Sequence, residues 1–154
     1  MSSYRSFLSL FFFMLIVALV AASGATFLPG AWYANLHKPS WTPPDWFFPL
    51  IWSALYVLIA LTGWLIFSGT NRLLKILWIM QLLINGLWSW LFFGMHRTDL
   101  GLLDIVALLF SIAALIFVAR QQGEKNVALL MSPYLLWVAC AMALNAYIFI
   151  FNSR

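Results

Sequence analysis

The chain has 154 residues, of which 65% are hydrophobic and only 8% are charged. In soluble domains roughly a quarter of all residues are charged. This composition therefore excludes a water-soluble domain and indicates lipid as the solvent. The net charge of +4 comes from scattered basic residues that form no run, which excludes a basic surface for nucleic acid. The single cysteine, Cys140, excludes an internal disulfide and a cysteine-cluster metal site, and we interpret it as a packing residue.

Charged residues divide the chain into apolar stretches, most of them at least as long as the roughly 20 residues that a transmembrane helix needs. The apolarity is continuous and does not alternate, which indicates helices and excludes the strands of a barrel. The sequence therefore predicts an all-α integral membrane protein in which residues 1–154 form one domain, a bundle of five transmembrane helices. We expect helices at about 6–27, 46–67, 72–93, 100–121 and 128–151, with an ordered loop at 28–45.

Two of these helices admit a second interpretation. The first follows Arg5 and ends in a run of small residues at 21–25, a pattern that signal peptides share. Its length favours a transmembrane helix. The fourth contains Asp104 near its start, and we expect this carboxyl either at the membrane interface or turned inward.

The distribution of basic residues predicts an orientation in the membrane. The side that holds the N-terminus carries Arg5, Arg72, Lys75, Arg120 and Lys125, and the other side carries Lys38, Arg97 and Arg154. Because basic residues favour the cytoplasmic side, we expect the N-terminus in the cytoplasm and the first loop outside. The odd number of helices and the absence of internal similarity argue against a transporter built from two matched repeats.

The first loop, from residue 28 to 46, is the only long one, and it combines stiff backbone with aromatic side chains. Its four prolines fix their own φ angles and favour extended backbone before them. It also carries three tryptophans and a tyrosine. We expect this loop to fold over one end of the bundle as a lid. The alternative is that its prolines and tryptophans only anchor it at the interface.

Polar and aromatic residues recur together on single helix faces. These faces hold Pro49, Trp52, Tyr56 and Gly63 on the second helix, Gln81, Asn85 and Trp88 on the third, and Pro133, Trp137, Ala141 and Asn145 on the fifth. An amide facing lipid leaves polar groups unpaired, so Asn85 and Asn145 should point inward and bring these faces with them. Aromatic walls with sparse polar groups suit a flat, mostly apolar ligand. The alternative is that the two asparagines only bridge helices.

The sequence contains no recognisable catalytic or metal-binding constellation. The acidic residues Asp45, Asp99, Asp104 and Glu124 are scattered near the predicted helix ends. His37 and His96 could in principle ligate haem iron, although isolated histidines at an interface are more often polar rim residues. We therefore predict neither catalytic acid–base residues nor a metal site.

Three segments resemble the translocator protein (TspO/MBR) family, whose members are also called tryptophan-rich sensory proteins or peripheral-type benzodiazepine receptors. These segments are Trp32-Tyr33-x-x-Leu36-x-Lys38-Pro39-x-Trp41-x-Pro43-Pro44 with Phe48-Pro49-x-x-Trp52-x-x-Leu55-Tyr56, Gln81-Leu82-x-x-Asn85-x-x-Trp88-Ser89-x-x-Phe92-Phe93-Gly94, and Pro133-Tyr134-x-x-Trp137-x-x-x-Ala141-x-x-Leu144-Asn145. The resemblance covers nearly the whole chain in order, and the chain looks like a bacterial-type member.

The resemblance implies a five-helix bundle, often dimeric, whose pocket beneath the first loop binds porphyrins such as protoporphyrin IX or haem. It also implies isoquinoline carboxamide and benzodiazepine ligands, and no required cofactor. Carried onto this sequence, the implied pocket residues are Tyr33, Trp41, Pro43, Trp52, Tyr56, Asn85, Trp88, Trp137, Ala141 and Asn145. We add Lys38 as the cation of the loop that would meet the propionates of a porphyrin.

The same resemblance implies roles that the residues alone do not settle. Family members promote light-dependent porphyrin breakdown, in which Trp52 and Trp137 would act as electron donors. Animal members bind cholesterol through a Leu, Tyr and basic pattern, but after Leu144 and Tyr147 the next base is Arg154, one position too far. Porphyrin is therefore the expected ligand. The alternatives are a lipid, sterol or metabolite transporter, and a ligand-sensing regulator that acts through protein partners.

Overall fold

The computed structural model describes residues 3–152, which form five long helices joined by one long first loop and otherwise short connections. The long helices are α1 (Ser3–Ala25), α3 (Phe47–Ser68), α4 (Arg72–Ser89), α5 (Thr98–Gln121) and α6 (Lys125–Asn152). A single helical turn, α2 (Ala31–Ala34), lies in the first loop, and a π-helical turn, η1 (Trp90–Gly94), extends α4. All five long helices are apolar and long enough to cross a membrane, which confirms the predicted membrane bundle.

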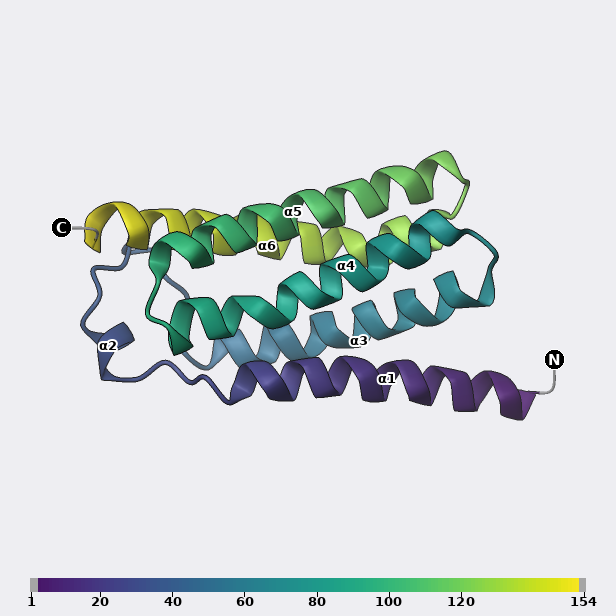
Figure 1. Ribbon diagram of the computed structural model, residues 1–154, viewed down its shortest axis with the longest axis horizontal. Helices are drawn as coiled ribbons and strands as arrows, with labels where there is room; N and C mark the ends of the chain where they lie inside the picture. The colour runs from purple at the N-terminus through teal and green to yellow at the C-terminus, as the bar shows by residue number, and fades with distance from the viewer. Residues whose placement is uncertain (1–2, 153–154) are drawn as a thin grey trace.

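The helices lie side by side along the long axis of the molecule, and the two termini lie at opposite ends (Figure 1). α1 packs against α3 and α4, α3 against α6, and α5 against both α4 and α6. The first loop, residues 26–46, lies at the end that also holds the C-terminus of α6, and we name this the loop end. The other end, with the connections 69–71 and 122–124, is the turn end.

The helices end close to where the charge pattern places them, and local features explain the short connections. The side chain of Asn71 accepts a hydrogen bond of 3.1 Å from the Leu74 amide and so caps α4. Gly123 follows α5 with a φ of +77°, a conformation that a glycine adopts without strain. α1 begins at Ser3, before the expected residue 6, and α6 at Lys125, before the expected 128.

Close packing surrounds Trp78 on the side of the bundle toward the turn end. Trp78 of α4 is only 2% exposed and its indole N–H donates a hydrogen bond of 3.0 Å to the Ile59 carbonyl. Gly63 lies directly against this ring, because a Cβ at Gly63 would stand 2.5 Å from Trp78 Cζ2. Fully buried side chains of this core include Ile59, Leu74, Ile112, Leu115 and Met131.

Asp104 of α5 turns into the bundle. Its side chain is 9% exposed, which decides between the two positions that the sequence left open for this carboxyl. Within residues 3–152, its Oδ2 atom has no hydrogen-bond partner.

The first loop is ordered because contacts hold it to two other elements. The Trp32 ring stacks on His96, with 4.4 Å between the ring centroids and 15° between the planes. Asn152, at the end of α6, accepts a hydrogen bond of 2.8 Å from the His37 amide and donates one of 3.0 Å to the His37 carbonyl. The loop is therefore attached both to the α4–α5 connection and to the C-terminal end of α6. This confirms the prediction of an ordered loop.

Candidate ligand-binding site

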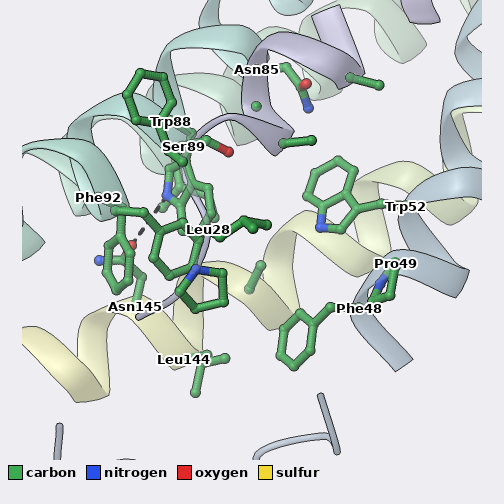
Figure 2. Close-up of a pocket in the computed structure, with 18 of the residues that line it drawn as sticks. Leu28, Phe48, Pro49, Trp52, Asn85, Trp88, Ser89, Phe92, Leu144 and Asn145 are labelled. Carbon is green, nitrogen blue, oxygen red and sulfur yellow. Dashed lines mark hydrogen bonds between the residues drawn. The ribbon is translucent and has the colours of Figure 1, made fainter. Parts of the chain in front are cut away.

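A cavity of about 520 Å³ lies at the loop end, inside the bundle and beneath the first loop. Figure 2 shows Trp52 on one side of it and Phe92 and Asn145 on the other. The volume falls within the roughly 300–1,000 Å³ that is typical of small-molecule sites. Its walls come from α1, the loop, α3, α4, η1, α5 and α6, so residues far apart in the sequence meet here.

Most of the site residues expected from the sequence line this cavity. They are Tyr33, Trp52, Tyr56, Asn85, Trp88, Trp137, Ala141 and Asn145. The helix faces on α3, α4 and α6 thus converge, as the inward direction of the amides requires.

The two asparagines both bridge helices and line the cavity. Asn85 accepts a hydrogen bond of 3.2 Å from the Tyr56 hydroxyl and donates one of 2.8 Å to the Tyr134 hydroxyl. Asn145 accepts one of 3.3 Å from the Trp88 indole (the dashed line in Figure 2) and donates one of 3.0 Å to the Thr98 carbonyl. The predicted bridging of helices is therefore confirmed, and the bridges tie four helices around the hollow. The contact of the two amides with a ligand stays a prediction.

Lys38, Trp41 and Pro43 do not line the cavity, and this corrects the expectation for all three. The Lys38 ammonium donates hydrogen bonds of 2.7 Å to the Tyr33 carbonyl and 3.2 Å to the Ala34 carbonyl, the last carbonyls of α2. These bonds hold it 4.6 Å from the centre of the Tyr33 ring instead of above the hollow. Trp41 is 52% exposed and lies in a turn in which the hydroxyl and the amide of Thr42 donate hydrogen bonds to the Pro39 carbonyl.

The π-helical turn brings in two residues that the helical periodicity did not place. Within η1 the Met95 amide donates to the Trp90 carbonyl, five residues earlier, at 2.8 Å. The extra residue in this turn lets Phe92 and Phe93 both reach the cavity next to Trp88. Such turns occur often at functional sites, and no residue pattern marks this one in advance.

Small residues of α1 form the part of the wall that sequence reasoning missed. Ala21, Gly24 and Ala25 line the cavity. A Cβ at Gly24 would lie 3.2 Å from Ser89 Oγ, so α1 and α4 approach closely at this point. The signal in the sequence is the run of small residues at 21–25, which also resembles the end of a signal peptide.

The aromatic walls offer both stacking surfaces and a free donor. Trp52 stacks on Tyr56, with 5.4 Å between ring centroids. Trp137 packs against the rings of Phe47 and Phe48. Its buried indole N–H has no partner among the described residues, so it can donate a hydrogen bond to a ligand.

The first loop contributes one titratable and one charged side chain to the lining of the cavity. Tyr33 and Asp45 both line it, and Asp45 is exposed. Burial, and in second place the negative charge of Asp45, raises the pKa of the Tyr33 hydroxyl above its ordinary value of 10.0. In the part of the chain that the structure describes, no three His, Cys, Asp or Glu side chains come together as metal ligands.

The fold and the cavity define an integral, multi-pass membrane protein with a ligand-sized hollow near one end of its bundle. The model of the TspO/MBR family matches residues 11–151, and the chain belongs to this family. This confirms the resemblance that the tryptophan-rich motifs predicted.

Relatives of known name lie in bacteria and in animals. The chain is 40% identical over 134 residues to protein CrtK of Rhodobacter capsulatus, which covers 83% of this chain and 82% of the relative. It is 39% identical to the tryptophan-rich protein TspO of Chlorobaculum tepidum, with 82% of this chain and 84% of the relative covered. It is 38% identical to the translocator protein of Sus scrofa, over 74% of this chain and 70% of the relative.

Proposed function

We propose that this protein is a membrane receptor that binds flat, mostly apolar ligands of the tetrapyrrole class in the cavity beneath its first loop. The observation that carries the proposal is the combination of aromatic walls with only a few polar groups in a hollow of about 520 Å³. The name of the tryptophan-rich sensory protein of Cereibacter sphaeroides, which is 37% identical, agrees with a receptor role.

A macrocycle gains most of its affinity in such a site from burial against the rings. Trp52 and Phe48 offer flat surfaces on one side of the hollow, and Trp88 and Phe92 offer them on the other (Figure 2). The ring of Trp137, which also lines the hollow, packs against Phe48. Burial of apolar surface contributes about 25 cal/mol per Å². The unpartnered N–H of Trp137 adds one fixed donor for an acceptor atom of the ligand.

We also propose that the N-terminus and the turn end face the cytoplasm, while the loop end lies outside. Arg72 and Lys75 begin α4 at the turn end, and Arg120 and Lys125 flank the α5–α6 connection there. At the loop end the described basic residues are Lys38 and Arg97, and Arg154 lies outside the described residues. The excess of basic residues at the turn end supports this orientation.

Ala141→Leu tests the site directly. The Ala141 side chain faces the hollow between Trp137 and Asn145, and leucine would occupy the space that the ring needs. We expect this variant to bind protoporphyrin IX at least about tenfold more weakly than the wild type does. The quenching of tryptophan fluorescence by the porphyrin measures both affinities. Helix content, measured by circular dichroism, should not change.

Ala143→Leu is the matched control, because Ala143 lies on the same helix, is exposed and does not line the cavity. Its porphyrin affinity should equal that of the wild type. Equal affinities in Ala141→Leu and wild type would contradict the proposal, since the ligand would then bind elsewhere.

A further inference from the structure

Of the four acidic residues, which all lie within 3–152, only Asp104 is buried. It follows Thr98, the first residue of α5, by six positions, which places it about 9 Å along the helix. Its side chain is 9% exposed, and its Oδ2 atom has no hydrogen-bond partner among the described residues. Ionisable side chains inside a membrane bundle are rare and mark functional sites. Asp104 therefore calls for a physical explanation.

No cation of the described chain neutralises this carboxyl. Asp104 forms no ion pair with a residue in 3–152. Arg97, which precedes α5, is held by two hydrogen bonds to the Asp99 carboxylate, at 2.8 and 2.6 Å. α5 packs against α4, η1 and α6, and η1 carries no charged residue. The charged residues of the other two helices lie at the turn end, and they are Arg72, Lys75 and Lys125.

The titratable group that interacts electrostatically with Asp104 is a neutral hydroxyl. It belongs to Tyr134 of α6, which is completely buried and accepts a hydrogen bond of 2.8 Å from Asn85. The other titratable residues of α6 do not replace it, because Cys140 is exposed and Tyr147 stacks on Phe151. A carboxylate charge at Asp104 would therefore lie in the bundle without a counter-charge.

Such a charge is strongly unfavourable, and a bound proton removes it. A buried carboxylate loses its hydration, and without a cation or hydrogen-bond donors nothing compensates for this loss. The protonated carboxyl has no net charge and gains an O–H donor of its own. The surroundings of Asp104 thus favour the neutral, protonated form.

The segment of α5 around Asp104 forms part of the cavity wall. Ile105 and Leu108 line the hollow. One turn earlier, a Cβ at Gly101 would stand 2.8 Å from Phe92 Cδ2 and 3.3 Å from Asn145 Oδ1, so α5 fits closely against both lining residues. A charge at Asp104 would draw water into this close-packed wall, and the state of its proton therefore affects the packing beside the cavity.

We propose that Asp104 is a proton-binding site inside the membrane, and that the folded bundle retains this proton at neutral pH. The stability of the bundle beside the cavity then depends on pH. The proton site does not depend on the ligand that the cavity binds, so it goes beyond the proposed function.

Infrared spectroscopy of the full chain tests the protonation directly. A protonated carboxyl absorbs at a different frequency from a carboxylate, and dodecyl maltoside, a detergent without carbonyl groups, leaves this region free. We expect the wild type at neutral pH to show one band of a protonated carboxyl. Asp104→Asn should remove the band. Asp99→Asn is the matched control and should keep it, because the Asp99 carboxyl accepts hydrogen bonds from Arg97 as a carboxylate.

The assignment does not depend on the folding of Asp104→Asn. An isotope label in the side-chain carboxyl of aspartate should shift the band, which excludes Glu124 and the C-terminus. Because the chain has three aspartates, a band that persists in both Asp45→Asn and Asp99→Asn then belongs to Asp104.

Unfolding in the same detergent gives a second, independent readout. The unfolded chain loses an aspartate proton above about pH 4. While the folded chain keeps this proton, each further pH unit should raise the equilibrium constant for unfolding by up to about tenfold. Asp104→Asn keeps the neutral shape and should lack this part of the pH dependence. Asp99→Asn should follow the slope of the wild type above about pH 4.

Two results overturn the inference. One is a wild type without a band of a protonated carboxyl at neutral pH, or with a band that Asp104→Asn leaves in place. The other is an equal pH dependence of unfolding in the wild type and in Asp104→Asn. Both measurements are made without ligand, so a failure of the proposed function, seen as unchanged porphyrin binding in Ala141→Leu, is a separate outcome.

Discussion

The two ends of the bundle contain the same kinds of residue and yet differ in what lies between the helices. At the turn end, Trp78 fills its space completely because Gly63 stands opposite and lets the ring approach. At the loop end, Trp88 of the same helix stacks on Phe92 and borders a hollow. Tryptophan content alone therefore does not create a site. The positions of small residues around the rings decide whether neighbouring helices pack closely or leave a cavity between them.

The ends also differ in how they are held together. Buried apolar side chains from α3, α4, α5 and α6 stabilise the turn end. The loop end depends more on directed contacts, which include the hydrogen bonds of Asn85 and Asn145 and the attachment of the loop to Asn152 and His96. The turn end should therefore be sensitive to lost volume, and the loop end to lost hydrogen bonds.

Truncating one tryptophan at each end should give the largest difference. Trp78→Ala should lower the free energy of unfolding by about 3–5 kcal/mol, because it leaves a void in close-packed surroundings. Trp52→Ala should cost roughly 1 kcal/mol, since its ring already borders the hollow. Trp52→Ala should in turn weaken porphyrin binding. Unfolding followed in detergent measures the free energy of unfolding of each variant. Equal losses in both variants would contradict the difference in packing between the two ends.

Releasing the loop should have an intermediate effect. Asn152→Ala removes both hydrogen bonds to the His37 backbone and should destabilise the loop by roughly 1–2 kcal/mol. The His37 amide should then exchange its hydrogen about tenfold faster. Ser132→Ala, which removes only a hydrogen bond within α6 near the turn end, is the control and should leave this exchange rate unchanged.

The smallest expected effect is seen at alkaline pH and tests the interaction between Tyr33 and Asp45 of the first loop. Because the pKa of Tyr33 is raised in the folded chain, the unfolded chain ionises first as the pH passes 10. The contribution of the neutral Tyr33 hydroxyl to the free energy of unfolding is complete below pH 10. It is lost as the pH rises above 10 and through the pKa that Tyr33 has in the folded chain. Tyr33→Phe should remove that part of the loss, and Asp45→Asn should shift the tyrosinate absorbance of Tyr33 toward lower pH. An unchanged titration curve in Asp45→Asn would contradict the interaction between these two residues.

The positions of the helices could be predicted because the charges that end them are strong, local signals. In the same way, the faces of α3, α4 and α6 follow from helical periodicity once Asn85 and Asn145 are required to point inward. The inward position of Asp104 is one of the two positions that the sequence left open, and burial in the bundle decides between them.

What could not be predicted depends on contacts between distant parts of the chain. The direction of Lys38 is set by the carbonyls at the end of α2, a turn that periodicity does not reveal. The positions of Phe92 and Phe93 follow from one extra residue in a helical turn. The contribution of α1 comes from Ala21 and Gly24. The run of small residues that contains them also resembles the end of a signal peptide, so it does not by itself indicate a cavity wall.

The buried core beside the cavity has a consequence for the movement of a ligand through the protein. Ile59 of α3 and Tyr134 of α6 are completely buried, so side chains fill the interior of the bundle at their level. A ligand in the cavity would therefore meet buried side chains on the side of the turn end. Passage of a ligand through the bundle from one face of the membrane to the other would require α3, α4, α5 and α6 to separate.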